Sequence, residues 1–268
     1  ERFFQKFDHF TFRVLFHGNN GKLREIQNVQ SRNELKIFTA SFIADKFVQT
    51  FIEEDRWKTF ASGLGVTLLI TFFAAILGII IGMTVAVGKV WCYQSGRLKI
   101  LDRIFDVYLT VIRGTPTLVQ LLIMYFIILK SVDNGIIIAI LAFGINSGAY
   151  VAEIVRGGIL GIDKGQMEAG RSLGLSAWTT MRKIILPQAI KNILPALGNE
   201  FITLLKETSV VGYIAITDLT KAAVAVQART YDAMFPLVSI ALIYLLLVTV
   251  MTWLQRKVER RLAKSDRR

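Results

Sequence analysis

The chain has 268 residues, of which 53% are hydrophobic and 19% charged, and its mean hydropathy is +0.49. This composition is more apolar than soluble domains usually are, which argues against an ordinary soluble protein. The formal net charge is +12. Nucleic-acid binding is a poor explanation for it, because the basic residues are spread over separate segments instead of forming one stripe.

Residues 1–57 precede the first long apolar run and are predicted to form an extracytoplasmic segment. Within it, residues 36–52 mix phenylalanines with polar groups, which fits an amphipathic helix lying on the outer membrane face. Those phenylalanines are Phe38, Phe42, Phe47 and Phe51. Residues 1–35 are expected to be disordered, and no function is assigned to them.

Five segments are predicted to cross a bilayer as helices. The uncharged run 59–88 is the longest, and at about 1.5 Å per residue it exceeds the roughly 30 Å hydrocarbon core. The fourth segment is interrupted by Glu200, Lys206 and Glu207 but is counted as a span. The predicted spans are 60–88, 104–129, 134–157, 190–216 and 234–255.

Charge in the connecting segments predicts the orientation. Residues 89–106, 156–191 and 256–268 carry four, six and seven basic groups, against two acidic groups each. The intervening segments 130–134 and 217–234 each balance to zero. The three basic segments are therefore expected on the cytoplasmic side and the N-terminus on the outside, with 256–268 as a basic cytoplasmic tail.

Residues 163–187 form a polar, glycine-containing loop between two apolar segments. Asp163 is expected to cap a short helix, which Gly174 ends in the left-handed conformation. Ser176 is expected to cap a second short helix, and Pro187 to open the fourth span. The sequence thus predicts a compact pair of helices at the membrane surface.

The middle of the first short helix contains Ala169 and Gly170, which have almost no side chain. On an exposed helix, small residues let another surface approach the backbone closely. Two interpretations stay open from the residues alone. The loop is either a docking site for a partner or a connector whose glycines only form turns.

The same loop resembles the signature of the permease subunits of ABC importers, E-A-A-x3-G-x9-I-x-L-P. In that family the loop is a coupling helix that seats in a groove of the ATP-binding subunit. Gly170 replaces the second alanine of the pattern but keeps its small size. The resemblance assigns ATPase coupling to Glu168, Ala169, Gly170, Gly174, Ile184, Leu186 and Pro187.

The stretch VIRGTPTLVQ, residues 111–120, resembles the R-G-T-P-x-x-V-Q run of permeases for polar amino acids. Pro116 suits the first turn of a helix or a kink within one. Arg113 and Pro116 are therefore assigned structural or gating roles, as is Arg156 further along the chain. For Arg113, the structural role is to extend its charged end to the cytoplasmic interface.

The stretch GAYVAEIVRGGI, residues 148–159, resembles the A-Y-x-x-E-x-x-R-x-G segment of the same branch. Asn146, Tyr150 and Glu153 share one face of the third span and are predicted to contact substrate. A carboxylate in a membrane helix must face protein or water. Glu153 either lines the translocation cavity and meets a cationic group of the cargo, or only pairs with Arg156 one turn away.

The stretch LLKETSVVGYIAI, residues 204–216, resembles the L-K-[DE]-[ST]-S segment of the fourth span. Glu207, Thr208 and Ser209 are predicted to contact substrate, with local neutralisation of Glu207 by Lys206 as the alternative. Carboxylates and hydroxyls together suit a zwitterion. The expected cargo is a basic amino acid such as arginine, lysine or histidine, with glutamine or another polar amino acid as the alternative.

The resemblance covers about residues 55–260. It implies an all-α polytopic membrane protein with the five-helix fold of type I ABC importer permeases, formed by residues 58–262, in the bacterial cytoplasmic membrane. It also implies a transport subunit and not an enzyme. The chain contains no Walker-type G-x-x-x-x-G-K-[ST], so ATP and Mg²⁺ are expected on a separate ATPase.

The implied partners are two ATPase subunits, a second permease subunit that is identical or homologous, an extracytoplasmic binding protein and membrane lipid. No cofactor or metal is expected in this chain. An ion-coupled secondary transporter or channel is the rival hypothesis, suggested by Glu153, Glu200 and Glu207. The short chain, the missing inverted repeat and the coupling-type loop count against it. A sensor or scaffold that docks an ATPase is the third hypothesis.

Overall fold

The computed structural model describes residues 32–95 and 98–265, and this part of the chain consists of helices and connections without a β-strand. The chain divides into two compact units, Glu1–Glu54 and Asp55–Arg268. In the first unit, helix α3 (Arg32–Phe47) continues into a π-helical turn, Val48–Ile52. The segment predicted as a helix, 36–52, is therefore helical, and its place on the outer membrane face stays a prediction. The disorder predicted for 1–35 falls almost wholly outside the described residues.

Three helices of the second unit lie in segments long and apolar enough to cross a bilayer: α4 (Arg56–Ser95), α7 (Gly135–Leu160) and α12 (Met234–Ser265). They contain the predicted first, third and fifth spans. Two bent helix pairs also meet these criteria of length and composition. The described part of the chain therefore has three candidate spans, or up to five if each bent pair is counted as one span. The predicted five spans fit this arrangement.

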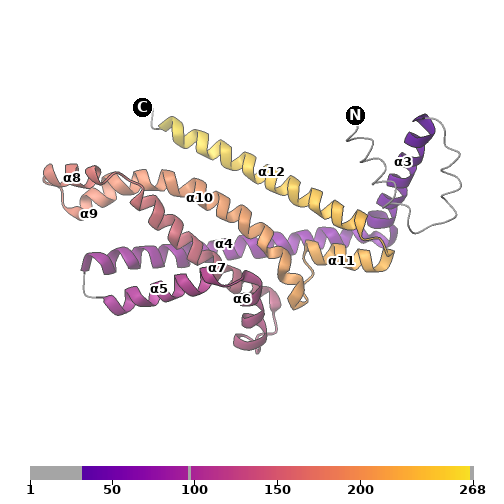
Figure 1. Cartoon of the computed structure of the whole chain (residues 1–268), viewed down its shortest axis with the longest axis horizontal. Helices are drawn as coiled ribbons and strands as arrows, with labels where there is room; N and C mark the ends of the chain where they lie inside the picture. Colours follow the sequence, from indigo (N-terminus) through magenta and orange to yellow (C-terminus); the bar gives the residue numbers. More distant parts are fainter. Residues whose placement is uncertain (1–31, 96–97, 266–268) are drawn as a thin grey trace, which may run out of the picture. The chain divides into compact units, whose positions relative to one another are not determined.

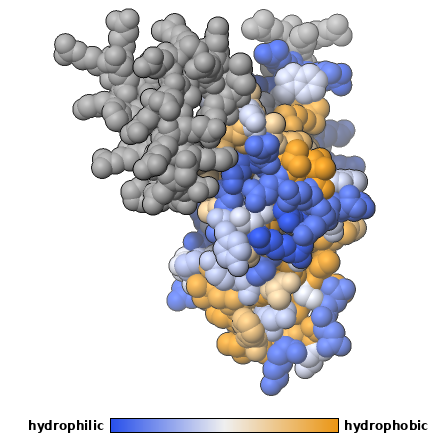
Figure 2. Space-filling model, turned by 90° about the vertical axis from the view of Figure 1, so that its right-hand side faces the viewer, coloured by the Kyte–Doolittle hydropathy of each residue, from blue (hydrophilic) through white to orange (hydrophobic). Residues whose placement is uncertain are grey.

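Apolar side chains on these helices point outward as well as inward. Phe72, Ile80 and Leu245 are 54%, 58% and 61% exposed. Figure 2, which looks at one end of the molecule, shows hydrophobic residues at the surface around a group of hydrophilic ones. A water-soluble domain would bury such side chains, whereas a bilayer solvates them.

The predicted second span, 104–129, is not one continuous helix. Helices α5 (Lys99–Gly114) and α6 (Thr117–Ile123) meet at a bend of 109°. Thr115 and Pro116 are extended between them. A proline disfavours helical backbone at the preceding residue and has no N–H to donate, so the chain breaks here and starts a new helix.

The fourth span also differs from the prediction at its far end. Helix α10 (Leu186–Glu207) tightens into a 3-10 segment, Thr208–Ile214, and is followed at a 51° bend by α11 (Leu219–Thr230). The segment 217–234 was expected to be a neutral connection, but α11 fills most of it. Asp218 caps α11 by accepting hydrogen bonds from two backbone N–H groups.

Small residues bring α4 and α7 into close contact. A Cβ atom on Gly82 of α4 would lie 2.5 Å from Val151 of α7, and one on Gly78 would lie 3.0 Å from Ser147. Close approach through glycine is the usual way for membrane helices to gain packing contacts. The first span is rich in glycine, and part of the close packing that these residues allow is within this chain.

The connections between the helices of the second unit lie in two groups, at its opposite ends. In Figure 1 the end of α4 and the start of α5 lie near the same end as the short helices after α7, whereas α11 and the start of α12 lie at the other end. The first two basic segments therefore gather at one end of the unit. This placement is compatible with the predicted alternation of the loop charges, and the side of the membrane stays a prediction.

Candidate functional site

The polar loop folds as a hairpin of two short helices, α8 (Lys164–Ser172) and α9 (Ala177–Thr180). Asp163 caps α8 by accepting from the N–H of Gly165 at 2.6 Å. Gly174 has φ +82° and ends α8, as predicted, because residues with a Cβ rarely adopt that conformation. Ser176 caps α9 by accepting from the N–H of Thr179 at 3.1 Å.

Glu168 and Ala169 are exposed on α8, as a docking surface requires. Gly170 is not: it is buried, and a Cβ there would lie 2.5 Å from Cγ2 and 2.7 Å from Oγ1 of Thr180. The expectation that Ala169 and Gly170 form one exposed small patch is wrong for Gly170. Its small size lets α8 pack directly on α9.

The last three coupling residues lie where the hairpin joins the fourth span. Ile184 and Leu186 are half-buried and Pro187 is exposed in the first turn of α10. A π-helical turn, Met181–Ile185, connects α9 to α10 without a break. The hairpin is therefore joined to α10 by continuous helical backbone.

Two apolar side chains of the hairpin were not among the predicted coupling residues. Leu173 is 81% exposed and Trp178 is 69% exposed, on either side of the turn at Gly174. The signal was present in the sequence, because a leucine and a tryptophan in a charged loop have no core to enter. Large exposed apolar side chains near a backbone turn are typical of a contact surface.

Arg113 and Arg156 converge on Glu153. The Glu153 carboxylate lies 2.7 Å from Nη2 of Arg156 and 3.5 Å from Nη1 of Arg113. The Arg113 guanidinium also lies 5.7 Å from the centre of the Tyr150 ring. The ion pair with Arg156 that the sequence left open is present. Because two cations share one anion, this cluster has a net positive charge in this conformation.

The predicted substrate residue Asn146 braces the bend between α5 and α6. It is 1% exposed, and its Nδ2 donates to Oε1 of Gln120 at 2.9 Å. Gln120 Nε2 in turn donates to the carbonyl of Ile112 and to Oγ1 of Thr115, both at 2.7 Å. The bond to Ile112 satisfies a carbonyl that the break at Pro116 leaves without a helical partner, because proline has no N–H to donate.

The three predicted residues on the fourth span have different surroundings. Thr208 is fully buried, donates to the carbonyl of Leu205 at 2.8 Å and lies 3.4 Å from the hydroxyl of Thr71 on α4. Glu207 and Ser209 are half-buried, and the Glu207 carboxylate interacts with Thr117 at the start of α6. Thr208 thus joins the end of α10 to α4. Of Glu207, Thr208 and Ser209, only Glu207 has a side chain that can carry a charge.

Glu200 is an acidic residue outside the predicted set that lies between two spans. Its Oε1 accepts from Oγ of Ser147 at 2.8 Å, which fixes α7 against α10. Glu153 lies six residues beyond Ser147 on α7, about 9 Å along the helix. Glu207 lies seven residues beyond Glu200 on α10, which runs the other way, about 10 Å in the opposite direction.

The predicted substrate residues consequently form no single cluster. Asn146 belongs to the bend, Tyr150 and Glu153 to the arginine cluster, and Glu207 and Ser209 to the other end of the α7–α10 contact. Their binding of substrate stays a prediction. Among the described residues no group of three His, Cys, Asp or Glu side chains is placed to hold a metal ion.

Comparison with known proteins matches residues 76–264 to the family described as binding-protein-dependent transport system inner membrane component. The arginine transport system permease protein ArtQ of Bacillus subtilis is 40% identical over 207 residues, covering 76% of this chain and 92% of that protein. A putative glutamine transport system permease protein GlnP of Rickettsia bellii is 39% identical over 206 residues, covering 76% and 92%.

A crystal structure of an amino acid ABC transporter with histidines superposes with a TM-score of 0.71 at 43% identity, covering 76% of this chain and 94% of that one. The helical fold is thus shared with a known amino acid ABC transporter. The chain belongs to the binding-protein-dependent transport system inner membrane components, the permease family of ABC importers, and is a multi-pass membrane protein.

Proposed function

We propose that this chain is the membrane-spanning subunit of an ATP-driven importer for a polar amino acid. The observation that carries the proposal is the α8–α9 hairpin, which presents Glu168, Ala169 and two large apolar side chains beyond the apolar helices. Relatives named for arginine and glutamine transport support the cargo class. An ion-coupled transporter would not need a docking surface of this kind.

The exposed hairpin surface has the composition of a protein contact. Leu173 and Trp178 supply apolar anchors, and Glu168 and Arg171 supply exposed charges beside them. Interfaces of this kind take most of their binding energy from a few large side chains at the centre. The partner that fits is an ATPase subunit, and two such subunits bind ATP and Mg²⁺ outside this chain.

The connection from the hairpin to α10 provides the mechanical step. Closure of the two ATPase subunits on ATP moves the docked hairpin, and the unbroken α9–α10 path transmits this movement into the membrane. The far end of α10 contacts α4 through Thr208 and α6 through Glu207. Such movement switches the pathway between inward-facing and outward-facing states, with a second permease subunit forming its other half.

Co-purification tests the docking. The chain is expressed with its ATPase, and the double variant Leu173→Ala/Trp178→Ala is expected to lose most of the bound ATPase. The matched control Ile100→Ala/Ile104→Ala removes two exposed apolar side chains of α5 and should retain it. Amino-acid uptake into proteoliposomes should need ATP and the ATPase. Uptake that continues without both would refute an ABC importer and favour ion coupling.

The positive arginine cluster and the two acidic residues of α10 suggest how a zwitterion is bound. Arg113 and Arg156 suit the α-carboxylate, since guanidinium groups bind carboxylates in a planar, bidentate way. Glu207 and Glu200 suit the ammonium or the cationic side chain. The arginine cluster lies roughly 9 Å to one side of the Ser147–Glu200 contact and Glu207 roughly 10 Å to the other, so a cargo molecule meets the arginines, Glu200 and Glu207 in succession.

Transport assays with arginine and glutamine test the cargo. Glu207→Gln should lower arginine uptake more than glutamine uptake, because only arginine has a cationic side chain to lose its partner. Glu153→Gln should affect both cargoes similarly, since Glu153 is already paired with arginines. If both variants keep the arginine-to-glutamine ratio, a basic cargo is not selected by these acids, and glutamine or another polar amino acid becomes the better assignment.

The orientation is part of the same proposal. The hairpin and the basic tail face the cytoplasm, and the first unit faces the outside, where a binding protein delivers cargo. A pH-sensitive fluorescent protein fused after Arg268 would respond to internal and not to external pH in intact cells. The opposite response would invert the orientation and place the hairpin out of reach of an ATPase.

A further inference from the structure

A groove of about 260 Å³ runs between α10 and α12. Its lining is mostly apolar: Leu194, Phe201 and Ile202 from α10, with Met251, Leu254 and Val258 from α12. Leu194, Leu254 and Val258 are 39%, 43% and 51% exposed, so the groove is open along its length. The volume is many times the roughly 30 Å³ that one water molecule occupies in the liquid, and the apolar lining gives water few partners.

The groove is fixed by a polar contact at its floor. Gln255 Nε2 of α12 donates to the carbonyl of Pro195 on α10 at 3.0 Å. A Cβ on Gly198 would lie 3.1 Å from Cδ of Gln255, so the glycine makes room for this side chain. The two helices are therefore held at a defined distance, and the groove between them is part of the fold.

One end of the groove lies beside a cluster of positive charge. Four exposed basic residues follow within six positions of α12: Arg256, Lys257, Arg260 and Arg261. Lys257 and Arg261 lie three and seven residues after Leu254, which lines the groove. At this helical spacing the three residues lie on the same side of α12. Lys257 also lies 5.2 Å from the centre of the Trp253 ring, a pairing typical of the membrane–water interface. The acidic residue among them, Glu259, also lines the groove, and its Oε1 accepts a hydrogen bond from Gln255 Nε2 at 3.0 Å.

We propose that this groove binds an anionic phospholipid, with an acyl chain between α10 and α12 and the phosphate at Lys257 and Arg261. The apolar cleft matches the chain and the cationic rim matches the headgroup, at the depth where the two parts of a lipid meet. A second copy of this chain fits less well. A symmetric contact through this face of α12 would bring two clusters of basic residues together.

Native mass spectrometry of the purified, detergent-solubilised full chain tests the site. The probes are phosphatidylglycerol and phosphatidylcholine of the same acyl length, titrated separately. The intact chain should hold one phosphatidylglycerol more tightly than phosphatidylcholine. Lys257→Gln/Arg261→Gln should weaken phosphatidylglycerol binding about tenfold or more and leave phosphatidylcholine binding nearly unchanged. Leu254→Trp, which fills the groove, should weaken both.

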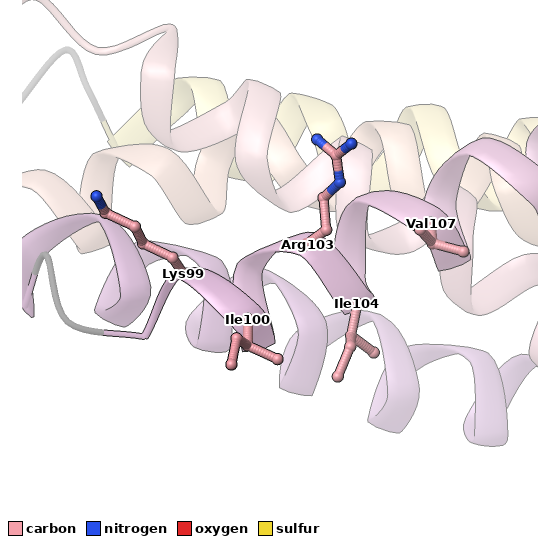
Figure 3. A pocket seen from close by; sticks show the side chains of 5 residues that line it. All are labelled: Lys99, Ile100, Arg103, Ile104 and Val107. Carbon is pink, nitrogen blue, oxygen red and sulfur yellow. The ribbon is translucent and has the colours of Figure 1, made fainter.

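Helix α5 offers the matched control. Figure 3 shows Lys99 and Arg103 on α5 next to Ile100 and Ile104, all on one helix without a second wall. Lys99→Gln/Arg103→Gln removes the same charge but should not change lipid affinity. Equal binding of the two lipids by the intact chain, or equal losses in both double variants, would overturn the proposal. If Leu254→Trp instead splits a dimer of the chain at unchanged lipid occupancy, the groove is a subunit interface.

Discussion

Restoring the alanine of the family pattern at position 170 should weaken the hairpin instead of stabilising it. In an isolated helix, Gly170→Ala would be favourable, because alanine is the better helix former by about 1 kcal/mol. In this protein the new Cβ would lie 2.5 Å from Cγ2 and 2.7 Å from Oγ1 of Thr180. Both separations are shorter than real Cβ contacts, so one of the two helices must shift.

The magnitude follows from these opposing terms. Thr180 is fully buried, and its Oγ1 donates to the carbonyl of Ser176 at 3.0 Å, so the side chain has little freedom to turn away. Overpacking of this kind typically costs about 1–3 kcal/mol. Taking about 2 kcal/mol and subtracting the helix gain leaves a net loss of about 1 kcal/mol. That corresponds to about a fivefold increase in the population of the opened hairpin.

Hydrogen exchange of residues 164–180 measures this opening directly. Gly170→Ala should exchange about fivefold faster than the parent. Thr180→Ala removes both close atoms, so Gly170→Ala should become neutral or stabilising in that background. Ala169→Gly is the control, because Ala169 is exposed: it should cost about 1 kcal/mol in either background. Slower exchange for Gly170→Ala in the parent chain would refute the packing argument.

Three further variants test the contacts that form the second unit. Gly82→Ala should lower the melting temperature in detergent through a clash with α7, whereas Gly65→Ala, with no atom within 4 Å of its Cβ, should leave it unchanged or raise it. Asp218→Ala should lose about 1 kcal/mol from the α11 cap, and Asp218→Asn should keep most of it, measured as hydrogen exchange in 219–230. Glu153→Gln should lower the melting temperature more than Arg156→Gln, because Glu153 pairs with two arginines and each exposed pair contributes about 0.2–1 kcal/mol.

The parts of the fold that follow from local chemistry could be predicted from the sequence. Long uncharged runs locate α4, α7 and α12 because the bilayer requires length and apolarity together. The hairpin ends follow from Asp163, Gly174 and Ser176, whose capping and turn chemistry acts within three residues. The family pattern then favours a docking loop over a plain connector, which turn chemistry alone cannot do.

The parts that depend on tertiary contacts could not be predicted in this way. The sequence around Pro116 is compatible with either a break between two helices or a kink within one. The hydrogen bonds of Gln120 and Asn146, which involve other parts of the chain, support the break. Helix α11 was not predicted, because its short apolar face resembles a loop until α4 packs against it. Spacing suggests the pair of Glu153 with Arg156 on the same helix, but Arg113 and the Ser147–Glu200 contact join different helices, so hydropathy and spacing do not reveal them.

The residues at the three positions of the E-A-A pattern have different surroundings in this hairpin, so different contacts limit their size and chemistry. Glu168 and Ala169 face outward, so their chemistry is limited by what docks there. Gly170 faces Thr180, so its size is limited by the chain's own packing, whatever the partner is. A glycine at the third position therefore leaves the docking face unchanged while it draws α8 closer to α9. Alanine at position 170 would therefore require either a smaller residue at position 180 or a larger separation of α8 and α9. A larger separation would also change the spacing of Leu173 and Trp178 on the proposed docking surface.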